Sequence, residues 1–258
     1  MTRAPAGTQP WPPPPTEPTH NLFRVTGVLG LLNCMMFPAL WATADTVNQH
    51  WEEWTPLPPP MRRSLIAKAT TDPDHPWIQK RNLGSNVHAL IAGQKPDPRD
   101  KTLLDPEPYL DAARDYWKQH IKTVLHQEDR IGNPTAGYTG TPDVIYVGFD
   151  GRTTLDDWKS GTVMQSSNRP YGFPELQATA YANAEFIVHP DGKITEMPAI
   201  HAANIVQLND DGTWSRHPVQ LENPAAYDAF KALVEIKKYA TFTQTDIIGG
   251  TPETGSAT

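Results

Sequence analysis

Hydrophobic side chains recur every three or four positions in much of the first half of the chain, as they do in amphipathic helices. In residues 108–127 they form one stripe that consists of Leu110, Ala113, Trp117, Ile121 and Val124. The pattern therefore predicts a long helix over residues 108–127. It also predicts a helix over residues 61–70 and another that begins at Asn86, with Ser85 as its N-cap.

Residues 25–44 contain no charged side chain, and this stretch is long enough to cross a membrane. However, Pro38 and several polar residues dilute its apolar content, and no basic cluster flanks it. We therefore expect a buried helix with Thr26 as its N-cap, followed by a second helix from about Ala39. A membrane tether formed by this stretch is the alternative interpretation.

The hydrophobic period changes to that of strands near residue 141. Two strands are expected over residues 141–149 and 153–159, joined at Asp150-Gly151, and then a helix that begins at Pro174 and extends to about Phe186. A second hairpin, over residues 202–208 and 214–221, and a final helix over residues 224–239 with Asn223 as its N-cap complete the pattern. The order of elements predicts a mixed α/β (α+β) fold, with a central mixed sheet flanked by helices and a helical N-terminal extension.

The two ends of the chain differ in composition from the rest. Seven of the first twenty residues are proline, which predicts a disordered arm over residues 1–20, and residues 243–258 are small and polar. We expect one domain over residues 21–242, a disordered tail after it, and an arm that is either a docking segment for a protein partner or a solubilising tail.

Composition limits the possible chemistry. The 258 residues include one cysteine, Cys34, so a single chain cannot supply the ligands of an iron–sulfur cluster. The net charge of −7 argues against a nucleic-acid partner, but residues 61–130 carry 12 basic and 10 acidic residues, a net charge of +2. A polyanion is expected to meet this middle region first.

The first hairpin carries the most informative polar residues. Asp157 and Lys159 are two positions apart and share one face of a strand. A strict two-residue turn at Asp150-Gly151 would place Asp143 opposite Trp158, whereas a three-residue loop would place it opposite Asp157. Two facing carboxylates repel each other unless a cation lies between them. We therefore expect an irregular hairpin with both carboxylates on one face, and if they face each other a divalent metal is the natural compensation. The alternative for Asp157 and Lys159 is a surface ion pair.

Further polar residues indicate a function only when their order along the chain is considered. Gln177 and Tyr181 share one face of a helix, and His88 lies on an earlier helix. Taken alone, the Gln177–Tyr181 pair and His88 are common features that indicate no particular function. The ordered set Gly84-Ser85-Asn86-Val87-His88, Gly140-Thr141-Pro142-Asp143, Asp157-Trp158-Lys159 and Gln177-x-x-x-Tyr181 resembles the RecB-like exonuclease branch of the PD-(D/E)XK nuclease superfamily, in particular the phage exonucleases and the related CRISPR-adaptation nucleases. The resemblance covers about Arg24 to Tyr239.

This resemblance implies a role for each matching residue. The metal ligands would be His88, Asp143, Asp157 and the backbone carbonyl of Trp158, with Lys159 as a catalytic residue. Gln177 and Tyr181 would position the substrate strand or the site itself. Arg169, in the loop before their helix, is a candidate for substrate contact because of its charge alone. Glu128 either matches an additional acidic residue of such nucleases or is a solvated charge at a helix end. Many relatives carry four cysteines for an iron–sulfur cluster, and this chain does not.

The expected activity is metal-dependent hydrolysis of DNA with two ions of Mg²⁺ or Mn²⁺. Carboxylates suit both metals, and an imidazole suits Mn²⁺ better. The leading hypothesis is an exonuclease that acts on DNA ends or single strands in the cytoplasm, in phage or bacterial replication, recombination or repair. Arg62, Arg63, Lys68, Lys80 and Arg81 are candidates for phosphate contacts. The alternatives are a structure-specific endonuclease of the same fold and a non-cleaving protein that binds DNA ends.

Overall fold

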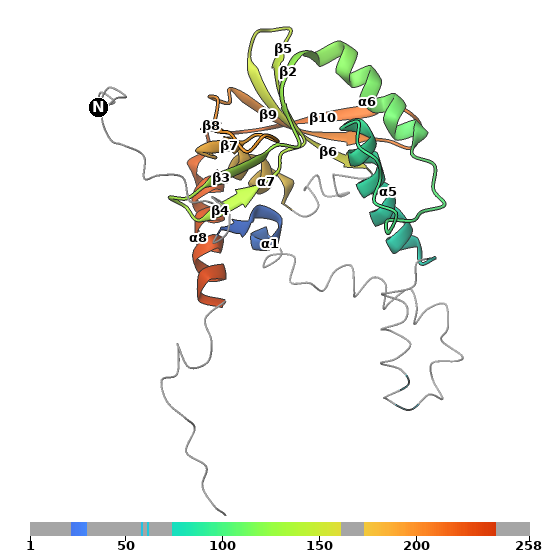
Figure 1. Cartoon of the computed structure of the whole chain (residues 1–258), viewed down its shortest axis with the longest axis horizontal. Helices are drawn as coiled ribbons and strands as arrows, with labels where there is room; N and C mark the ends of the chain where they lie inside the picture. Colours follow the sequence, from blue (N-terminus) through green and yellow to red (C-terminus); the bar gives the residue numbers. More distant parts are fainter. Residues whose placement is uncertain (1–21, 30–57, 59–60, 62–73, 161–172, 241–258) are drawn as a thin grey trace, which may run out of the picture.

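The computed structural model describes residues 22–29, 58, 61, 74–160 and 173–240. These residues form five helices and two five-stranded sheets (Figure 1). Each sheet contains both parallel and antiparallel pairs. The predicted mixed α+β class is thus confirmed, although two sheets replace the single central sheet that we expected.

The larger sheet has the order β10-β9-β6-β5-β2. Its strands are β2 (Ile121–Gln127), β5 (Val144–Gly148), β6 (Thr153–Ser160), β9 (Ala202–Leu208) and β10 (Trp214–Val219). β5 and β6 form the first predicted hairpin, and β9 and β10 form the second, both antiparallel. β6 and β9 are parallel neighbours at the centre of the sheet, so β6 is paired on both sides.

The smaller sheet has the order β1-β4-β3-β7-β8 and was not predicted from the sequence. Its strands are β1 (Phe23–Arg24), β3 (Arg130–Asn133), β4 (Tyr138–Gly140), β7 (Phe186–Val188) and β8 (Ile194–Glu196). They contain two to four residues each, too few to show a clear alternation of polar and apolar side chains.

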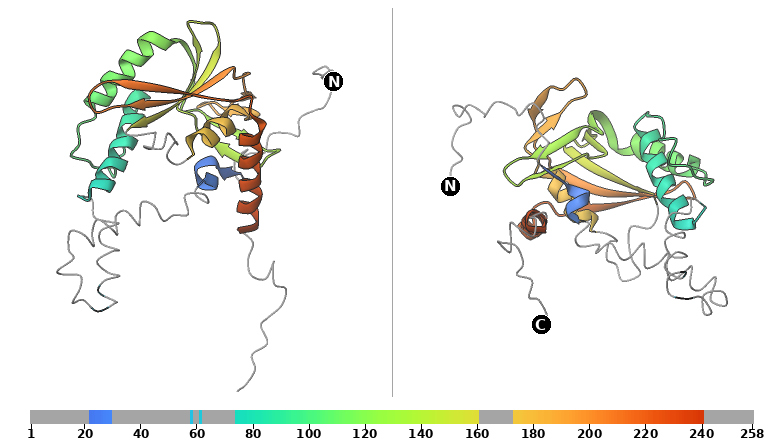
Figure 2. Two further views of the ribbon diagram at one scale, coloured as in Figure 1. Left: turned by 180° about the vertical axis from the view of Figure 1, so that it is seen from behind. Right: turned by 60° about the horizontal axis from the view of Figure 1, so that its bottom comes forward.

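Helices cover both faces of the larger sheet. α5 (Pro76–Ile91) and α6 (Glu107–His120) pack on one face, where Tyr116 and Trp158 are buried in a shared cluster. α1 (Val25–Leu29), α7 (Pro174–Ala182) and α8 (Pro224–Ala240) gather on the other, as Figure 2 shows from two further directions. Since burial of one large apolar side chain contributes about 1.5–3 kcal/mol, these two clusters stabilise the sheet from both sides.

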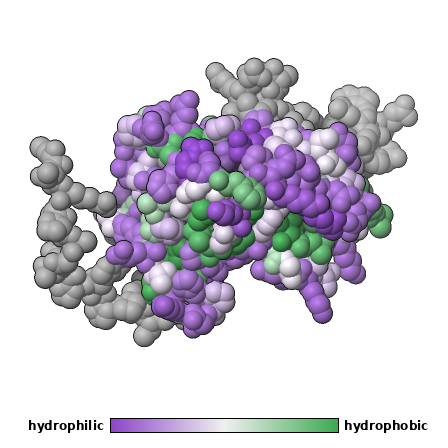
Figure 3. All heavy atoms as spheres, turned by 90° about the horizontal axis from the view of Figure 1, so that it is seen from above, coloured by the Kyte–Doolittle hydropathy of each residue, from purple (hydrophilic) through white to green (hydrophobic). Residues whose placement is uncertain are grey.

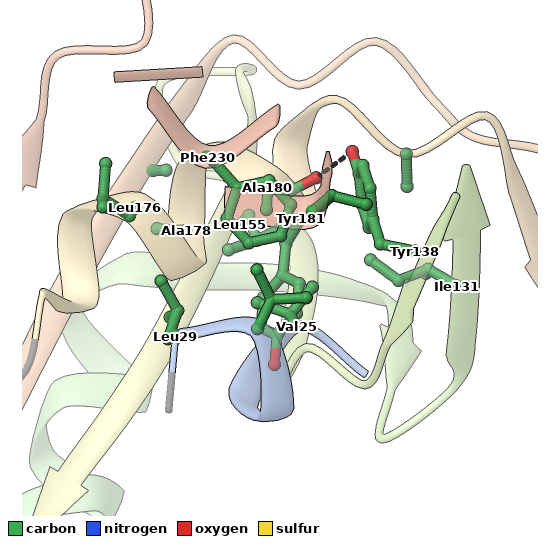
Figure 4. Packing of buried hydrophobic residues seen from close by; sticks show 14 of the residues in the cluster. Val25, Leu29, Ile131, Tyr138, Leu155, Leu176, Ala178, Ala180, Tyr181 and Phe230 are labelled. Carbon is green, nitrogen blue, oxygen red and sulfur yellow. Dashed lines mark hydrogen bonds between the residues drawn. The ribbon is translucent and has the colours of Figure 1, made fainter. Parts of the chain in front are cut away.

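The hydrophobic cluster around α1, α7 and α8 also joins the larger sheet to the smaller one. Figure 4 shows Val25 and Leu29 of α1 beside Leu155 and Tyr181, with Tyr138 of β4 close by. The Tyr138 hydroxyl donates a hydrogen bond of 2.7 Å to the backbone carbonyl of Ala180 in α7. A buried hydroxyl needs such a partner, and this bond ties β4 to the helix that carries the predicted residues Gln177 and Tyr181.

Three predicted helix boundaries are wrong. The helix expected over residues 108–127 ends at His120, and β2 follows, because Ile121, Thr123 and Val124 are β-branched and pair with β5. α7 ends at Ala182 rather than Phe186, which begins β7. α1 begins at Val25, so Thr26 lies inside the helix rather than at its N-cap.

The start of α5 is a further correction. The helix begins at Pro76, so Ser85 lies in its middle and is not an N-cap. At Gly84, which precedes Ser85, a Cβ atom would lie 3.0 Å from Ser160 Oγ. The glycine is therefore explained by close packing of α5 against β6.

Several predictions fall outside the described residues. They concern the arm over residues 1–20, the tail over 243–258, the chain after Leu29 with the helix from Ala39, the helix over 61–70 apart from Met61, and the side chains of Cys34, Arg62, Arg63, Lys68 and Arg169.

In the part of the chain that the structure describes, no helix is both long and apolar enough to span a membrane. On the face in Figure 3, hydrophilic residues predominate, and the hydrophobic ones lie in separate areas among them.

Candidate metal centre

The register of the β5–β6 hairpin brings the two predicted aspartates together. Val144 pairs with Asp156, so Asp143 lies opposite Asp157. The loop contains three residues, closed by a hydrogen bond of 2.9 Å from Gly148 N to Arg152 O. Gly151 has a φ of 78°, a conformation that favours glycine. The predicted irregular register, with both carboxylates on one face, is confirmed.

Both carboxylates are buried, and each has a cationic neighbour. Asp143 is 7% exposed and Asp157 is 1% exposed. Asp143 Oδ1 lies 3.0 Å from His88 Nδ1, and its Oδ2 accepts a hydrogen bond of 2.6 Å from the backbone N–H of Trp158. Asp157 forms an ion pair with Lys159. The two carboxylates are thus held in place by charged and polar partners from α5 and β6.

Gln177 and Tyr181 of α7 complete the same cluster. Gln177 Nε2 lies 3.0 Å from both Asp157 Oδ1 and the Tyr181 hydroxyl oxygen, and its Oε1 lies 3.5 Å from Lys159 Nζ. A Cβ atom at Gly140 would overlap the ring of Tyr181, so the glycine permits the close approach of this ring to β4. The spacing of Gln177 and Tyr181 on one helix face therefore aims both residues at the aspartates.

Glu128 belongs to the cluster, but not at a helix end as we expected. It lies in the turn between β2 and β3, with a φ of 54° that non-glycine residues seldom adopt. A carboxylate oxygen of Glu128, a ring nitrogen of His88 and a carboxylate oxygen of Asp143 all lie within 4.8 Å of one another. These three side chains form a group that could hold a metal ion, beside Asp157 on the opposite strand.

The charges of this cluster shift the pKa values of its members. Burial opposes the protonated form of His88, but the carboxylate of Asp143 outweighs burial and raises the pKa of His88 to about 9. Burial, and then the negative charge of Asp143, raise the pKa of Glu128 to about 7. The carboxylates thus disfavour one another's ionised forms, and a bound cation would stabilise these forms.

The pKa values of the two facing aspartates shift in opposite directions. Burial would raise the pKa of Asp143, but His88 outweighs it and lowers that pKa. Burial raises the pKa of Asp157, although Lys159 acts in the opposite direction. Burial would also lower the pKa of Lys159, and the charge of Asp157 reverses this effect. Facing carboxylates commonly differ in this way, and such perturbed groups are frequent at functional sites.

Trp158 and Arg169 are the remaining predicted site residues. The Trp158 side chain is 1% exposed and packs edge-on against Tyr116, on the far side of β6 from Asp157. Its proposed contribution through the backbone carbonyl stays a prediction, because side-chain packing does not bear on it. Arg169 lies outside the described residues.

Two arginines that the sequence did not single out line a cavity that shares Tyr181 with the cluster. Arg24 and Arg130 line a cavity of about 360 Å³ together with Thr141 and Tyr181. Arg130 is exposed while the next residue, Ile131, is buried. The other residues of β3, from Ile131 to Asn133, are all buried, so no alternation in the sequence could have identified Arg130.

A larger cavity lies elsewhere in the described part of the chain. It has a volume of about 790 Å³, and its lining includes Tyr146, Asn204 and Arg216. Tyr146 and Asn204 surround Asp156, which points to the opposite face of the sheet from Asp157. We assign the candidate chemistry to the clustered carboxylates. The smaller cavity adjoins this cluster through Tyr181, which lines the cavity and also contacts Gln177.

No protein-family model matches this chain, and a search of curated proteins finds no match. The functional argument therefore depends on the site itself, whose members come from α5, the β2–β3 turn, β5, β6 and α7.

Proposed function

We propose that this chain is a metal-dependent deoxyribonuclease of the PD-(D/E)XK type, and that it acts as an exonuclease on DNA ends or single strands. One observation carries the proposal: Asp143 and Asp157 face each other in the predicted register, and His88, Lys159 and Gln177 all contact this pair. A chance arrangement of separate surface charges would not bury two carboxylates face to face.

The donor set fits a hard divalent cation. His88, Glu128 and Asp143 would hold one ion, and Asp157 with the Trp158 carbonyl would complete the site for a second. Bound Mg²⁺ or Mn²⁺ would polarise the phosphodiester and lower the pKa of a bound water. Because a ligand imidazole must be unprotonated, metal binding is expected to displace the proton that His88 Nδ1 and Asp143 Oδ1 share.

Lys159 is the residue that we assign to the reacting phosphate. Its ammonium group contacts Asp157, and Gln177 Oε1 lies 3.5 Å from it, so the long side chain is oriented on two sides. A cation in this position would orient the attacking water or stabilise the negative charge that develops on the phosphoryl oxygens. Gln177 and Tyr181 would keep Asp157 and Lys159 in this arrangement.

The cavity with Arg24 and Arg130 supports an approach of the DNA backbone from the β4 side of the cluster. Both arginines line it together with Thr139, Thr141 and Tyr181, which offer further polar groups to a phosphate. Lys80 and Arg81 lie on an exposed part of α5. Binding through such contacts weakens as salt rises, so salt dependence would support this path. The cytoplasm, where such DNA ends occur, is the compartment that this proposal implies.

The experiment that tests the proposal compares end-labelled linear DNA with covalently closed circular DNA, in Mg²⁺, Mn²⁺ or EDTA. We expect degradation of linear DNA alone, in the presence of metal, and loss of this activity in Lys159→Ala. Lys122→Ala, which removes an exposed lysine of β2, is the matched control and should retain activity.

Other outcomes would replace the proposal. Cutting of circular DNA would identify a structure-specific endonuclease of the same fold. Metal-independent binding of DNA ends without degradation would identify an end-binding protein. Equal activity of the wild type and Lys159→Ala would contradict the assigned site.

A further inference from the structure

A second cluster of potential metal ligands lies outside the candidate nuclease site. It consists of His126 at the end of β2, Asp129 in the β2–β3 turn and His189 directly after β7. One ligand atom from each of these three side chains lies within 4.8 Å of the other two. His126 Nδ1 is 3.0 Å from Asp129 Oδ2, and the two imidazole rings have centroids 5.4 Å apart.

The fold explains why residues so distant in sequence meet here. β3 and β7 are antiparallel, and Arg130 pairs with Val188, so the next positions outward, Asp129 and His189, lie opposite each other. His126 reaches the same point from the larger sheet, where it pairs with Ile145 of β5. The cluster thus lies where the edge strand of one sheet passes into the other.

The environment of these side chains suits a coordinated ion. The side chains of His126 and Asp129 are only 15% and 12% exposed, so bulk water competes weakly for them. His189 Nε2 lies 2.8 Å from the hydroxyl of Thr195 in β8. If the ring donates its Nε2 proton to this hydroxyl, the lone pair of Nδ1 is left for a metal. Ligand histidines are commonly fixed by such a second hydrogen bond.

We propose that His126, Asp129 and His189 form a binding site for a divalent transition metal of the Zn²⁺ type, separate from the His88–Asp143 centre. Two imidazoles and one carboxylate are a typical three-ligand set for Zn²⁺, with water in the fourth position. Bonds of about 2.0–2.2 Å in a tetrahedron place ligand atoms about 3.3–3.6 Å apart, so the three atoms need to move by an ångström or so at most. Two imidazoles also make the site softer than the carboxylate-rich centre beside it, which favours Zn²⁺ over Mg²⁺.

The site has a structural consequence for its neighbour. Glu128, which belongs to the candidate nuclease centre, lies between His126 and Asp129 in the sequence and holds a left-handed backbone conformation. An ion bound by the residues on either side of Glu128 would stabilise this turn against relaxation. The ion would also tie β2 to the β7–β8 hairpin.

The test is a count of bound metal on the full chain without a histidine tag. Equilibrium dialysis against Zn²⁺ alone, followed by elemental analysis, should show one equivalent fewer in His189→Ala than in the wild type. In Asp143→Asn, which impairs the other centre, one tight equivalent should remain. With Co²⁺ in place of Zn²⁺, this variant should show the visible d–d bands of a four-coordinate ion, and the bands should disappear in Asp143→Asn/His189→Ala.

Two further variants keep the test decisive. His201→Ala removes an exposed histidine outside both clusters and should bind as much Zn²⁺ as the wild type. Thr195→Val leaves all three ligands and removes only the hydroxyl beside His189, so Zn²⁺ affinity should fall about 10-fold to 100-fold. Circular dichroism of each variant checks that it is folded.

The outcome is independent of the proposed nuclease activity. Equal Zn²⁺ stoichiometry in the wild type and His189→Ala, or loss of all Zn²⁺ binding in folded Asp143→Asn, would overturn the second site. Neither result would depend on whether the chain degrades DNA. Conversely, absence of nuclease activity would leave the predicted Zn²⁺ count unchanged.

Discussion

Two adjacent aspartates of β6 occupy opposite faces of the same sheet and differ in almost every respect except burial. Asp156 is 0% exposed and Asp157 is 1% exposed. Asp156 accepts hydrogen bonds from the hydroxyls of Tyr116 and Tyr146, at 2.6 and 2.9 Å, and from Asn204 Nδ2 at 2.7 Å. Asp157 instead faces another carboxylate and is held by Lys159 and Gln177.

The comparison shows that burial of a carboxylate does not identify a functional site, whereas the nature of its partners does. Neutral side chains from α6, β5 and β9 donate hydrogen bonds to the oxygens of Asp156. Asp156 therefore acts as a structural link between these three elements. Asp157 instead lies opposite the like charge of Asp143, so this pair depends on cations, which are Lys159 and His88 or a bound metal ion. The predictions below test this contrast, from the largest expected effect to the smallest.

Asp157→Asn should reduce metal-dependent DNA degradation by about 10³-fold, because it removes a charged group from the site where the reacting phosphate would be stabilised. Initial rates with end-labelled linear DNA in Mg²⁺ or Mn²⁺ measure the effect. Asp156→Asn is the comparison variant and should keep most of its activity per folded molecule. Since Asp156 is fully buried, the folded fraction of both variants must be determined alongside the rate. Equal losses in the two variants would contradict the assignment of Asp157.

Asp156→Ala should lower the free energy of unfolding by about 3–5 kcal/mol, because it leaves three buried donors without their acceptor. Urea unfolding in EDTA measures this change without a contribution from bound metal. Asp228→Ala is the control, since Asp228 lies on α8 with a side chain that is 65% exposed. If both variants were equally stable, the network around Asp156 would not be the structural link that we describe.

The same residue gives a pH dependence with a defined sign. Burial, opposed by hydrogen bonds from Tyr116, Asn204 and Tyr146, raises the pKa of Asp156 to about 6 from an ordinary value of 3.8. The folded chain then binds this proton more tightly than the unfolded chain, so the contribution of Asp156 to stability falls as pH rises from about 4 to about 6. Relative to Asp156→Asn, the wild type should lose up to about 3 kcal/mol across this range. A difference that is constant with pH would contradict the raised pKa.

Gly140→Ala should destabilise the chain by about 1–3 kcal/mol, because the added Cβ atom overlaps the ring of Tyr181 and α7 must shift. Thermal unfolding measures the loss. In Gly27→Ala the nearest atom to the new Cβ is Arg24 Cβ at 3.9 Å, an ordinary contact, so this control should change stability little. Similar behaviour of the two variants would show that the ring of Tyr181 is not packed closely on β4.

Much of the larger sheet could be predicted from the sequence, because its information is local. The turn residues Asp150-Gly151, the β-branched and aromatic residues of β5, and the two facing aspartates together indicate the observed register. The start of α8 at Pro224 is also encoded locally, since proline suits the first turn of a helix.

The errors have a common physical cause in tertiary pairing. Ile121 and Val124 continue the helical stripe of α6 in the sequence, but they lie in β2, which pairs with β5. Propensity cannot reveal this, because a partner that is distant in the sequence decides the outcome. The strands of the smaller sheet are too short for a periodic signal, and so Glu128 was assigned to a helix end rather than to the β2–β3 turn. Arg24 and Arg130 line one cavity because of strand pairings within this smaller sheet.

Tyr181→Phe should have the smallest effect. The hydroxyl accepts a hydrogen bond of 3.0 Å from Gln177, while the ring packs in the cluster shown in Figure 4 and would stay in place. Loss of one such bond changes a free energy by about 0.5–1.5 kcal/mol, so activity should fall about tenfold or less. Tyr227→Phe removes a hydroxyl near Tyr138, away from the aspartates, and should leave the rate unchanged. A loss in Tyr181→Phe as large as that in Asp157→Asn would mean that the hydroxyl acts on the reacting phosphate itself, rather than through the position of Gln177.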